Sequence, residues 1–248
     1  MEIKSPYIVE LADTLDHHWY HVWRKKGDAK GKYLGVFASA TTILNAYPQS
    51  AQLTKWIAEQ GFSEAQEIKS EKGRQGTKIH DSIEALFKGA ELTRASGYKI
   101  EEWYKIDAFA RWYSEYKPKV LALELPVFSK ALKVPGRLDL LAEIDGKHYI
   151  IDYKSSASLH KHFPLQFSVY ADAVEEFCGF KIDATAALHL GARNKDKYTF
   201  KEWANWREDH LPVFKSVYTT WVYDNKKQND KTVEAPVLVL PERIKLEL

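Results

Sequence analysis

The sequence predicts an α/β fold, in which a central sheet is flanked by helices. The stretch 136–154 has the pattern of two strands joined by a tight turn, and further strand-like runs stand at 120–128 and 184–190. Segments with apolar residues at helical spacing lie around these strands, at about residues 77–88, 101–116 and 165–178.

The composition is that of a globular protein. Hydrophobic residues make up 45% of the 248 positions and charged residues 28%, so the chain can bury a core. We expect an N-terminal hairpin and helical region at 1–118, packed on a core at 119–248 to give one compact domain. The net charge of +2 permits nucleic-acid binding without predicting it.

The single cysteine, Cys178, excludes an internal disulfide and any four-cysteine metal or iron–sulfur site. The first residues lack the apolar core of a signal peptide, and the sequence has no long uncharged apolar run. We therefore expect a cytoplasmic protein that does not enter a membrane.

The N-terminal region alternates in polarity at 17–23 and again at 33–38, with a lysine- and glycine-rich turn at 24–32 between them. This pattern predicts a hairpin. The strand histidines His17, His18 and His21 invite a metal site, but histidines on a surface strand are the more common case.

Helices follow the hairpin. Short helices are expected at 41–45 and 49–60, and a Ser63-x-x-Gln66 capping box predicts the start of a third. Gly73 and Gly76 are expected to interrupt the helical structure before the helix at 77–88.

The helix at 77–88 carries an apolar stripe that includes Ile79 and Ile83, with His80 beside it. Glu84 lies one turn after His80, close enough to orient the imidazole ring. From the residues alone, a core histidine held by a neighbour is the more common interpretation.

The aromatic side chains of 101–116 have helical spacing and are typical of a core helix, although some could stack on nucleobases. The strand at 120–128 contains Pro126, which favours an edge position or a bend. On this strand, Glu124 is a candidate accessory acid of a metal site, with a surface position or a supporting position behind the metal ligands as equal alternatives.

The hairpin at 136–154 is centred on Asp145-Gly146, a dipeptide that favours a type I′ turn. A two-residue loop fixes the register, so that Ile144 pairs with Lys147 and the pairing continues outward from there.

That register places Asp139 opposite Asp152 on one face, and Lys154 projects from the same face. Directly opposed carboxylates destabilise a sheet, unless a hard divalent cation lies between them. The alternative is that one aspartate forms a local hydrogen bond where the strands end early.

Pro164 introduces the helix at 165–178, on which Gln166 and Tyr170 share one face. The remaining expectations are a pairing of the strand at 184–190 with 195–200, a mostly helical segment at 203–223, a solvated loop at 225–231, and an edge strand in the tail at 237–248.

Four short motifs carry a resemblance. Gly136-Arg137-Leu138-Asp139 followed by Asp152-Tyr153-Lys154 resembles the paired signature of the PD-(D/E)XK nuclease superfamily. The Gly76–His80 and Gln166–Tyr170 motifs resemble the Gly-x-x-x-His and Gln-x-x-x-Tyr motifs of its RecB-like branch. The order and spacing fit over roughly residues 36–192. Residues 39–44 are also similar to the start of the subgroup that contains the mitochondrial genome maintenance exonuclease and phage and CRISPR-associated relatives.

The resemblance implies a restriction-endonuclease-like core with a mixed sheet. It assigns Mg²⁺ or Mn²⁺ to His80, Asp139, Asp152 and the Tyr153 carbonyl, with Lys154 as a catalytic residue beside the two aspartates. It implies that Gln166 and Tyr170 contact the DNA backbone or position the catalytic residues. Leu138 in place of proline and Asp152 in place of glutamate are departures that keep the metal ligands.

The leading hypothesis is a metal-dependent DNA exonuclease that acts on DNA with a free end or a single-stranded region. Alternatives are a structure-specific endonuclease on the same core and a non-catalytic DNA-binding subunit. Partner proteins of recombination or replication fit this hypothesis. The sequence gives neither the polarity of cleavage nor the oligomeric state.

Overall fold

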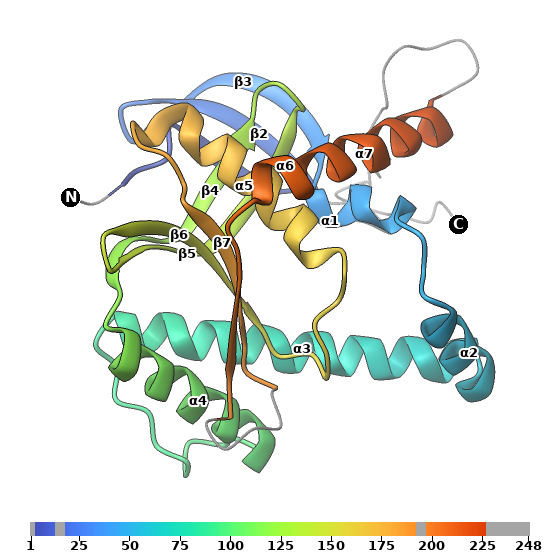
Figure 1. Cartoon of the computed structure of the whole chain (residues 1–248), viewed down its shortest axis with the longest axis vertical. Coiled ribbons are helices and arrows are strands. Elements are labelled where there is room, and N and C mark those ends of the chain that lie inside the picture. The colour runs from blue at the N-terminus through green and yellow to red at the C-terminus, as the bar shows by residue number, and fades with distance from the viewer. Residues whose placement is uncertain (1–2, 13–17, 192–196, 227–248) are drawn as a thin grey trace, which may run out of the picture.

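The central feature of the computed structural model, which describes residues 3–12, 18–191 and 197–226, is a five-stranded sheet (Figure 1). Its strands follow the order β4-β5-β6-β7-β8. The pair β6–β7 is parallel and the other neighbours are antiparallel, so the sheet is mixed, as predicted. The strands are β4 (Lys119–Ser129), β5 (Val134–Ile144), β6 (Lys147–Lys154), β7 (Ala184–His189) and β8 (Thr199–Trp203).

Helices cover both faces of this sheet (Figure 1). Helices α3 and α4 pack on one face, and α5 packs on the other together with α7. The helices are α1 (Ala40–Ile43), a 3₁₀ turn (Leu44–Ala46), α2 (Ala51–Gln60), α3 (Phe62–Phe87), α4 (Ile100–Tyr116), α5 (Phe163–Cys178), α6 (Trp206–Asp209) and α7 (Leu211–Asn225).

Two apolar cores result from this layering. On the α3–α4 face, Ile79 and Trp112 pack against strand residues such as Ile151. On the α5–α7 face, Val169 and Phe214 belong to a cluster that also reaches N-terminal residues. The mixed α/β prediction is therefore confirmed, with helices placed where their apolar stripes can be buried.

The N-terminal region contains the expected hairpin and one further strand. It is a three-stranded antiparallel sheet of β1 (Tyr7–Leu11), β2 (Trp19–Lys26) and β3 (Ala29–Ala38). The strands continue through most of the expected turn, because Gly27, at φ +62°, lets the chain reverse within two residues. His17 lies outside the described residues.

Helix α3 also differs from expectation, since it runs unbroken through Gly73 and Gly76. Each glycine costs a helix about 1 kcal/mol relative to alanine. Burial of residues such as Ile79 and Ile83 against α4 and the sheet offsets that cost. The N-cap is Gly61 rather than the expected Ser63, so the capping box does not form.

The remaining expectations met mixed outcomes. Pro126 lies on β4, an edge strand, as predicted, and β8 pairs with β7 as expected. Trp203 ends β8 instead of beginning a helix, because helical structure starts only at Trp206. The expected tail strand and most of the expected loop at 225–231 lie outside the described residues.

Within the described ranges, none of the helices combines the length and the apolar content that crossing a bilayer requires.

Candidate active site

The β5–β6 hairpin positions the candidate site. Asp145 and Gly146 have φ values of +50° and +77°, as the type I′ turn requires. The ladder then follows the predicted register from Ile144↔Lys147 to Leu140↔Ile151. The turn chemistry read from the sequence therefore gives the correct pairing over this part of the hairpin.

Beyond Leu140↔Ile151 the two strands no longer pair with each other. Strand β5 stays with β4, and β6 stays with β7 through Asp152, Tyr153 and Lys154. The Tyr153 N–H donates to Asp139 Oδ2 at 2.7 Å, so a side chain takes the place of a ladder bond. The direct opposition of Asp139 and Asp152 expected from the sequence is thus replaced by a local hydrogen bond, although neither strand ends there.

Strand β4 is irregular opposite Asp139. Glu124 has a φ of +44°, in the left-handed region that a non-glycine residue adopts only at a cost. Leu138 and Leu140, two residues apart on β5, belong to the cores on opposite faces of the sheet. The usual alternation of side chains is therefore interrupted at Asp139, which turns its carboxylate toward α3.

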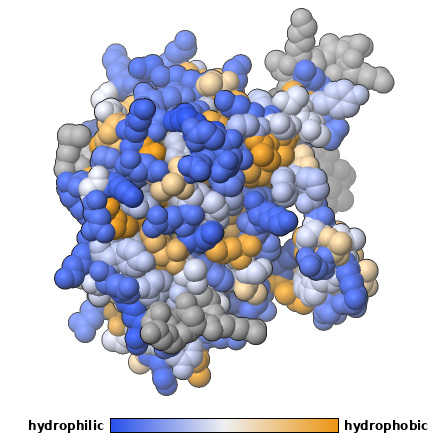
Figure 2. Space-filling model, in the orientation of Figure 1, coloured by the Kyte–Doolittle hydropathy of each residue, from blue (hydrophilic) through white to orange (hydrophobic). Residues whose placement is uncertain are grey.

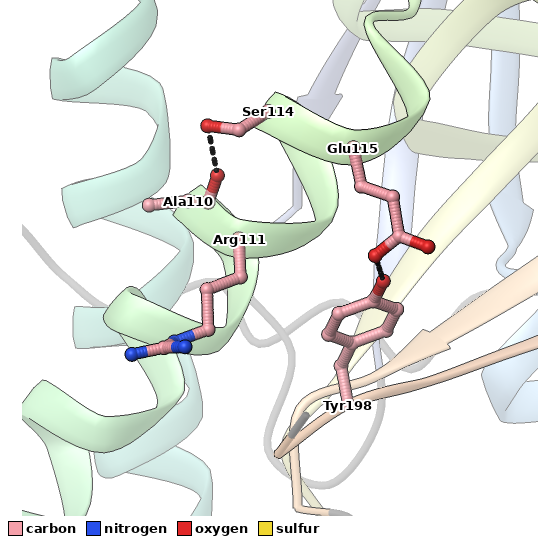
Figure 3. Close-up of a pocket in the computed structure, with 5 residues that line it drawn as sticks. All are labelled: Ala110, Arg111, Ser114, Glu115 and Tyr198. Atoms are coloured by element: carbon pink, nitrogen blue, oxygen red, sulfur yellow. Dashed lines mark hydrogen bonds between the residues drawn. The ribbon is translucent and has the colours of Figure 1, made fainter. Parts of the chain in front are cut away.

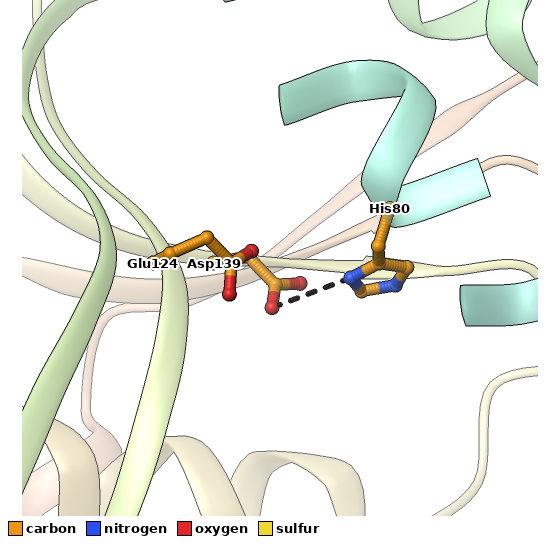
Figure 4. Close-up of side chains that lie close together, drawn as sticks. All are labelled: His80, Glu124 and Asp139. Atoms are coloured by element: carbon orange, nitrogen blue, oxygen red, sulfur yellow. Dashed lines mark ion pairs between the residues drawn. The ribbon is translucent and has the colours of Figure 1, made fainter. Parts of the chain in front are cut away.

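His80, Glu124 and Asp139 meet at this irregularity (Figure 4). One ligand atom from each lies within 4.8 Å of the others. His80 Nδ1 is 3.5 Å from Asp139 Oδ1, and His80 Nε2 is 3.0 Å from the Tyr153 carbonyl oxygen. Both ring nitrogens of His80 thus face oxygen atoms that are candidate metal ligands.

Asp152 and Lys154 form the adjoining part of the site. Lys154 Nζ lies 2.6 Å from Asp152 Oδ2 and 4.6 Å from the centre of the Phe163 ring. Asp152 lies outside the group of three described above. Its Oδ2 is buried, and Lys154 is the partner that the structure gives it.

The charges of these groups act on one another. Burial lowers the pKa of His80, but the Asp139 carboxylate outweighs burial and raises that pKa to about 9. Burial and the charge of Asp139 raise the pKa of Glu124 to about 7 and that of Asp152 to about 6. Burial also opposes ionisation of Asp139, yet His80 holds the pKa of this carboxyl below its usual value.

Glu84 does not contact the His80 ring as expected. Its carboxylate forms an ion pair with Lys88 one turn along α3, at 2.6 Å. Asp139 and the Tyr153 carbonyl hold the ring nitrogens of His80 instead. Helical spacing alone could not reveal this, because the strand residues that reach His80 are distant in sequence.

Gln166 and Tyr170 are buried on α5 rather than open to solvent. Gln166 Nε2 donates to the Tyr170 hydroxyl at 3.3 Å. The Tyr170 ring lies against Gly136 so closely that a Cβ there would fall 2.3 Å from its nearest atom. Gly136 is therefore a position where β5 and α5 come into direct contact.

Sequence reasoning did not single out Lys105. This half-buried side chain of α4 donates to the Ser155 carbonyl at 2.9 Å, directly after Lys154. Burial and the nearby Lys72 lower its pKa. A lone lysine in an aromatic helix gives no sequence signal of this kind, because only folding brings it to the Ser155 loop.

A surface pocket lies elsewhere on α4 (Figure 3). The Tyr198 hydroxyl donates to Glu115 across it. Its lining contains none of the candidate site residues; it is formed by Ala110, Arg111, Ser114, Glu115 and Tyr198.

Comparison with known proteins agrees with this geometry. The family model described as the PD-(D/E)XK nuclease superfamily matches residues 53–220, which include every candidate site residue. A search of curated proteins gives no match to the sequence. The chain belongs to the PD-(D/E)XK nuclease superfamily, a family of metal-dependent nucleases that act on DNA.

Proposed function

We propose that the protein is a metal-dependent DNA exonuclease of the RecB-like branch. The observation that carries the proposal is the meeting of His80, Glu124 and Asp139 where β5 and β6 separate, beside the Asp152–Lys154 pair. Helix α3 brings His80 to this group, β5 brings Asp139, and β4 brings Glu124 in a strained conformation. A purely structural hairpin would avoid such a cluster of charges.

The residues fit a divalent cation. Burial and the charge of Asp139 disfavour the ionised forms of Glu124 and Asp152, and a cation among the three carboxylates would offset both effects. The buried Asp152 carboxylate lies beside this group and is paired with Lys154. Hard carboxylate and carbonyl oxygens suit Mg²⁺, and the nitrogen of His80 favours Mn²⁺ more than an all-oxygen site would.

We assign the cation to His80, Asp139, Asp152 and the Tyr153 carbonyl, with Glu124 as an accessory acid. A bound divalent ion would acidify a water molecule and polarise the phosphodiester. Glu124 lies close enough to His80 and Asp139 to serve the same ion directly or through water.

Lys154 is the proposed catalytic cation. The rings of Phe163 and Phe167 lie under its ammonium group at 4.6 and 5.4 Å, and Asp152 lies beside it, so the group is held in place. From there it can orient the attacking water and stabilise the negative charge that develops on the phosphate oxygens.

Gln166 and Tyr170 support this site from behind. Their burial and the contact of Tyr170 with Gly136 favour the positioning role over direct contact with the DNA backbone. Tyr170 supports β5 three residues before Asp139, so its ring helps to set where that carboxylate lies.

The test uses linear single- and double-stranded DNA, labelled separately at the 5′ and 3′ ends, beside a closed circle. Each substrate is incubated with Mg²⁺, Mn²⁺ or EDTA, and Lys154→Ala serves as the inactive control. We expect metal-dependent loss of linear DNA with the circle spared, and the labels then give the polarity.

The same experiment separates the alternatives. Cleavage of the circle would indicate an endonuclease. Retained DNA binding without cleavage in either metal would indicate a non-catalytic binding subunit, and would overturn the proposal.

A further inference from the structure

The β2–β3 ribbon carries an aromatic cluster on its outer face, apart from the candidate active site. The rings of His21, Trp23 and Tyr33 lie 5.3 to 6.0 Å from one another, and His21 Nδ1 is 2.9 Å from the Tyr33 hydroxyl. The inner face of the same sheet is buried through Val22, which packs with Phe128. Core packing therefore does not require the outer aromatic residues.

The backbone of the ribbon is irregular where this cluster lies. The register shifts on both sides of Trp23, which pairs with Tyr33 instead of the Leu34 that an unbroken register would give. Gly31 permits the close approach, since a Cβ there would lie 2.5 Å from the Arg24 carbonyl oxygen. Such bulges re-aim side chains, and here they place the tyrosine and the tryptophan side by side.

Tyr33 is the accessible member of the cluster, with 49% of its surface exposed. Lys30 Nζ lies 4.2 Å above the Trp23 ring and 2.6 Å from Glu10. An aromatic side chain that is half exposed and supported from behind by other rings offers a flat, rigid surface on which a nucleobase could stack.

The end of the ribbon is strongly basic. Residues 24–32 contain one acidic residue, Asp28, and five basic ones, Arg24, Lys25, Lys26, Lys30 and Lys32, whereas the whole chain carries only +2. Four of the five basic side chains are exposed. Within the described ranges, Lys30 is the member of this group that forms an ion pair.

We propose that the outer face of the β2–β3 ribbon binds single-stranded nucleic acid, with a base stacked on Tyr33 and phosphates held by the basic tip. The inference rests on the proposed function in that the bound strand would be part of the nuclease substrate. Charge complementarity selects this occupant: a second copy of the chain would bring the same positive tip against this one, and the lysines of β3 discourage strand pairing along its edge.

The test measures binding in EDTA, where no cleavage interferes. A fluorescent oligo-dT and an abasic oligonucleotide of the same length are titrated with wild-type protein and with Tyr33→Ala. Tyr223→Ala is the matched control, because Tyr223 is an even more exposed tyrosine, on α7. We expect Tyr33→Ala to weaken oligo-dT binding about tenfold and to leave abasic binding unchanged, because stacking needs a base.

A second variant tests the basic tip. In Lys25→Glu/Lys26→Glu, the dependence of log K on log salt should become shallower by about 1.4, the value for two phosphate contacts on a single strand. Lys215→Glu, on α7, is the charge control. Because Tyr33 and the two lysines lie at the surface or half-buried on the ribbon, melting temperatures near that of wild type are expected and are checked first.

Several outcomes would overturn the inference. These are equal affinities for Tyr33→Ala and Tyr223→Ala, an equal loss on oligo-dT and on the abasic strand, or binding of anionic vesicles in place of the oligonucleotide. Failure of this inference and failure of the proposed function remain distinct. Normal cleavage with unaltered binding by Tyr33→Ala would reject only this site, and weakened binding by that variant without any wild-type cleavage would reject only the nuclease assignment.

Discussion

The two ends of the β5–β6 hairpin are built differently. At the turn end, Asp145 and Gly146 both have a positive φ, which Asp tolerates better than most residues and Gly adopts freely, and every pair follows the register that the turn imposes. At the open end, Asp139 takes a hydrogen bond from the Tyr153 backbone and the strands part. Regular pairing therefore belongs to the end that supports the fold, and its interruption belongs to the end that carries the candidate site.

The β2–β3 ribbon shows the same contrast between regular and irregular pairing. Its irregular register around Trp23 again coincides with polar and aromatic groups that the core does not use. The face of the molecule that Figure 2 shows is mainly hydrophilic, with its apolar side chains in separate groups.

The largest effect should come from a carboxylate at the open end. Asp152→Ala removes a proposed metal ligand, and we expect cleavage to fall by at least about 10³-fold, since metal assistance contributes several kcal/mol. Asp145→Asn, at the turn end of the same hairpin, is the matched control and should cleave normally, because Asn-Gly also suits a type I′ turn. Wild-type activity in Asp152→Ala would refute the site assignment.

The metal affinity should depend on pH. Because a ligand nitrogen must lose its proton, and the pKa of His80 is about 9, metal binding should strengthen by up to about tenfold per pH unit between pH 7 and 9. Calorimetric titration with Mn²⁺ measures this slope. His80→Gln should flatten it, and an unchanged slope in that variant would mean that His80 is not a ligand.

The stability of the metal-free protein should fall with rising pH, whereas its metal affinity rises. The pKa of His80 is higher in the folded chain than its ordinary value of 6.5, so its stabilising interaction is complete below pH 6.5 and is lost as the pH rises through about 9. Melting temperatures in EDTA should therefore fall over this range. Added Mg²⁺ should raise the melting temperature more at pH 9 than at pH 7.

Alanine substitutions at two glycines of the hairpin should both lower stability, but only one of them should reduce cleavage. Gly136→Ala puts a methyl group into the Tyr170 ring, which should cost about 1–3 kcal/mol of unfolding free energy and reduce cleavage, because β5 must move near Asp139. Gly146→Ala meets no neighbouring atom, but its φ of +77° should cost about 1–2 kcal/mol with cleavage retained. Denaturant melts and cleavage rates measure both.

The glycine comparison has its own check. Tyr170→Leu should partly restore the stability of Gly136→Ala, which a double-mutant cycle reports as coupling. Additive losses would show that the two residues do not meet as the structure has them.

The smallest effect is expected at Glu84. Its carboxylate pairs with Lys88 rather than with His80, and exposed helix pairs contribute only about 0.3–0.5 kcal/mol. Glu84→Gln should therefore change the cleavage rate by less than about twofold. A loss as large as that of His80→Gln would instead return Glu84 to the role expected from helical spacing.

The sequence by itself determined the parts that depend on neighbouring residues. The Asp145-Gly146 turn gave the hairpin and its register, Pro164 gave the start of α5, and the motifs around Asp139 and Lys154 gave the family. These signals are local, because turn and cap conformations depend on a few adjacent side chains.

Only the tertiary structure decided how the site is assembled. Glu124 lies against Asp139 in a strained backbone conformation on β4. Helix α3 continues through Gly73 and Gly76, which places His80 in the site, and Glu84 pairs with Lys88 instead of His80. At Glu124 and at the two glycines, packing against distant elements outweighed a local cost of about 1 kcal/mol or more per residue. Spacing along the chain does not contain that balance, because the partners that determine it come together only when the sheet and its helices close on each other.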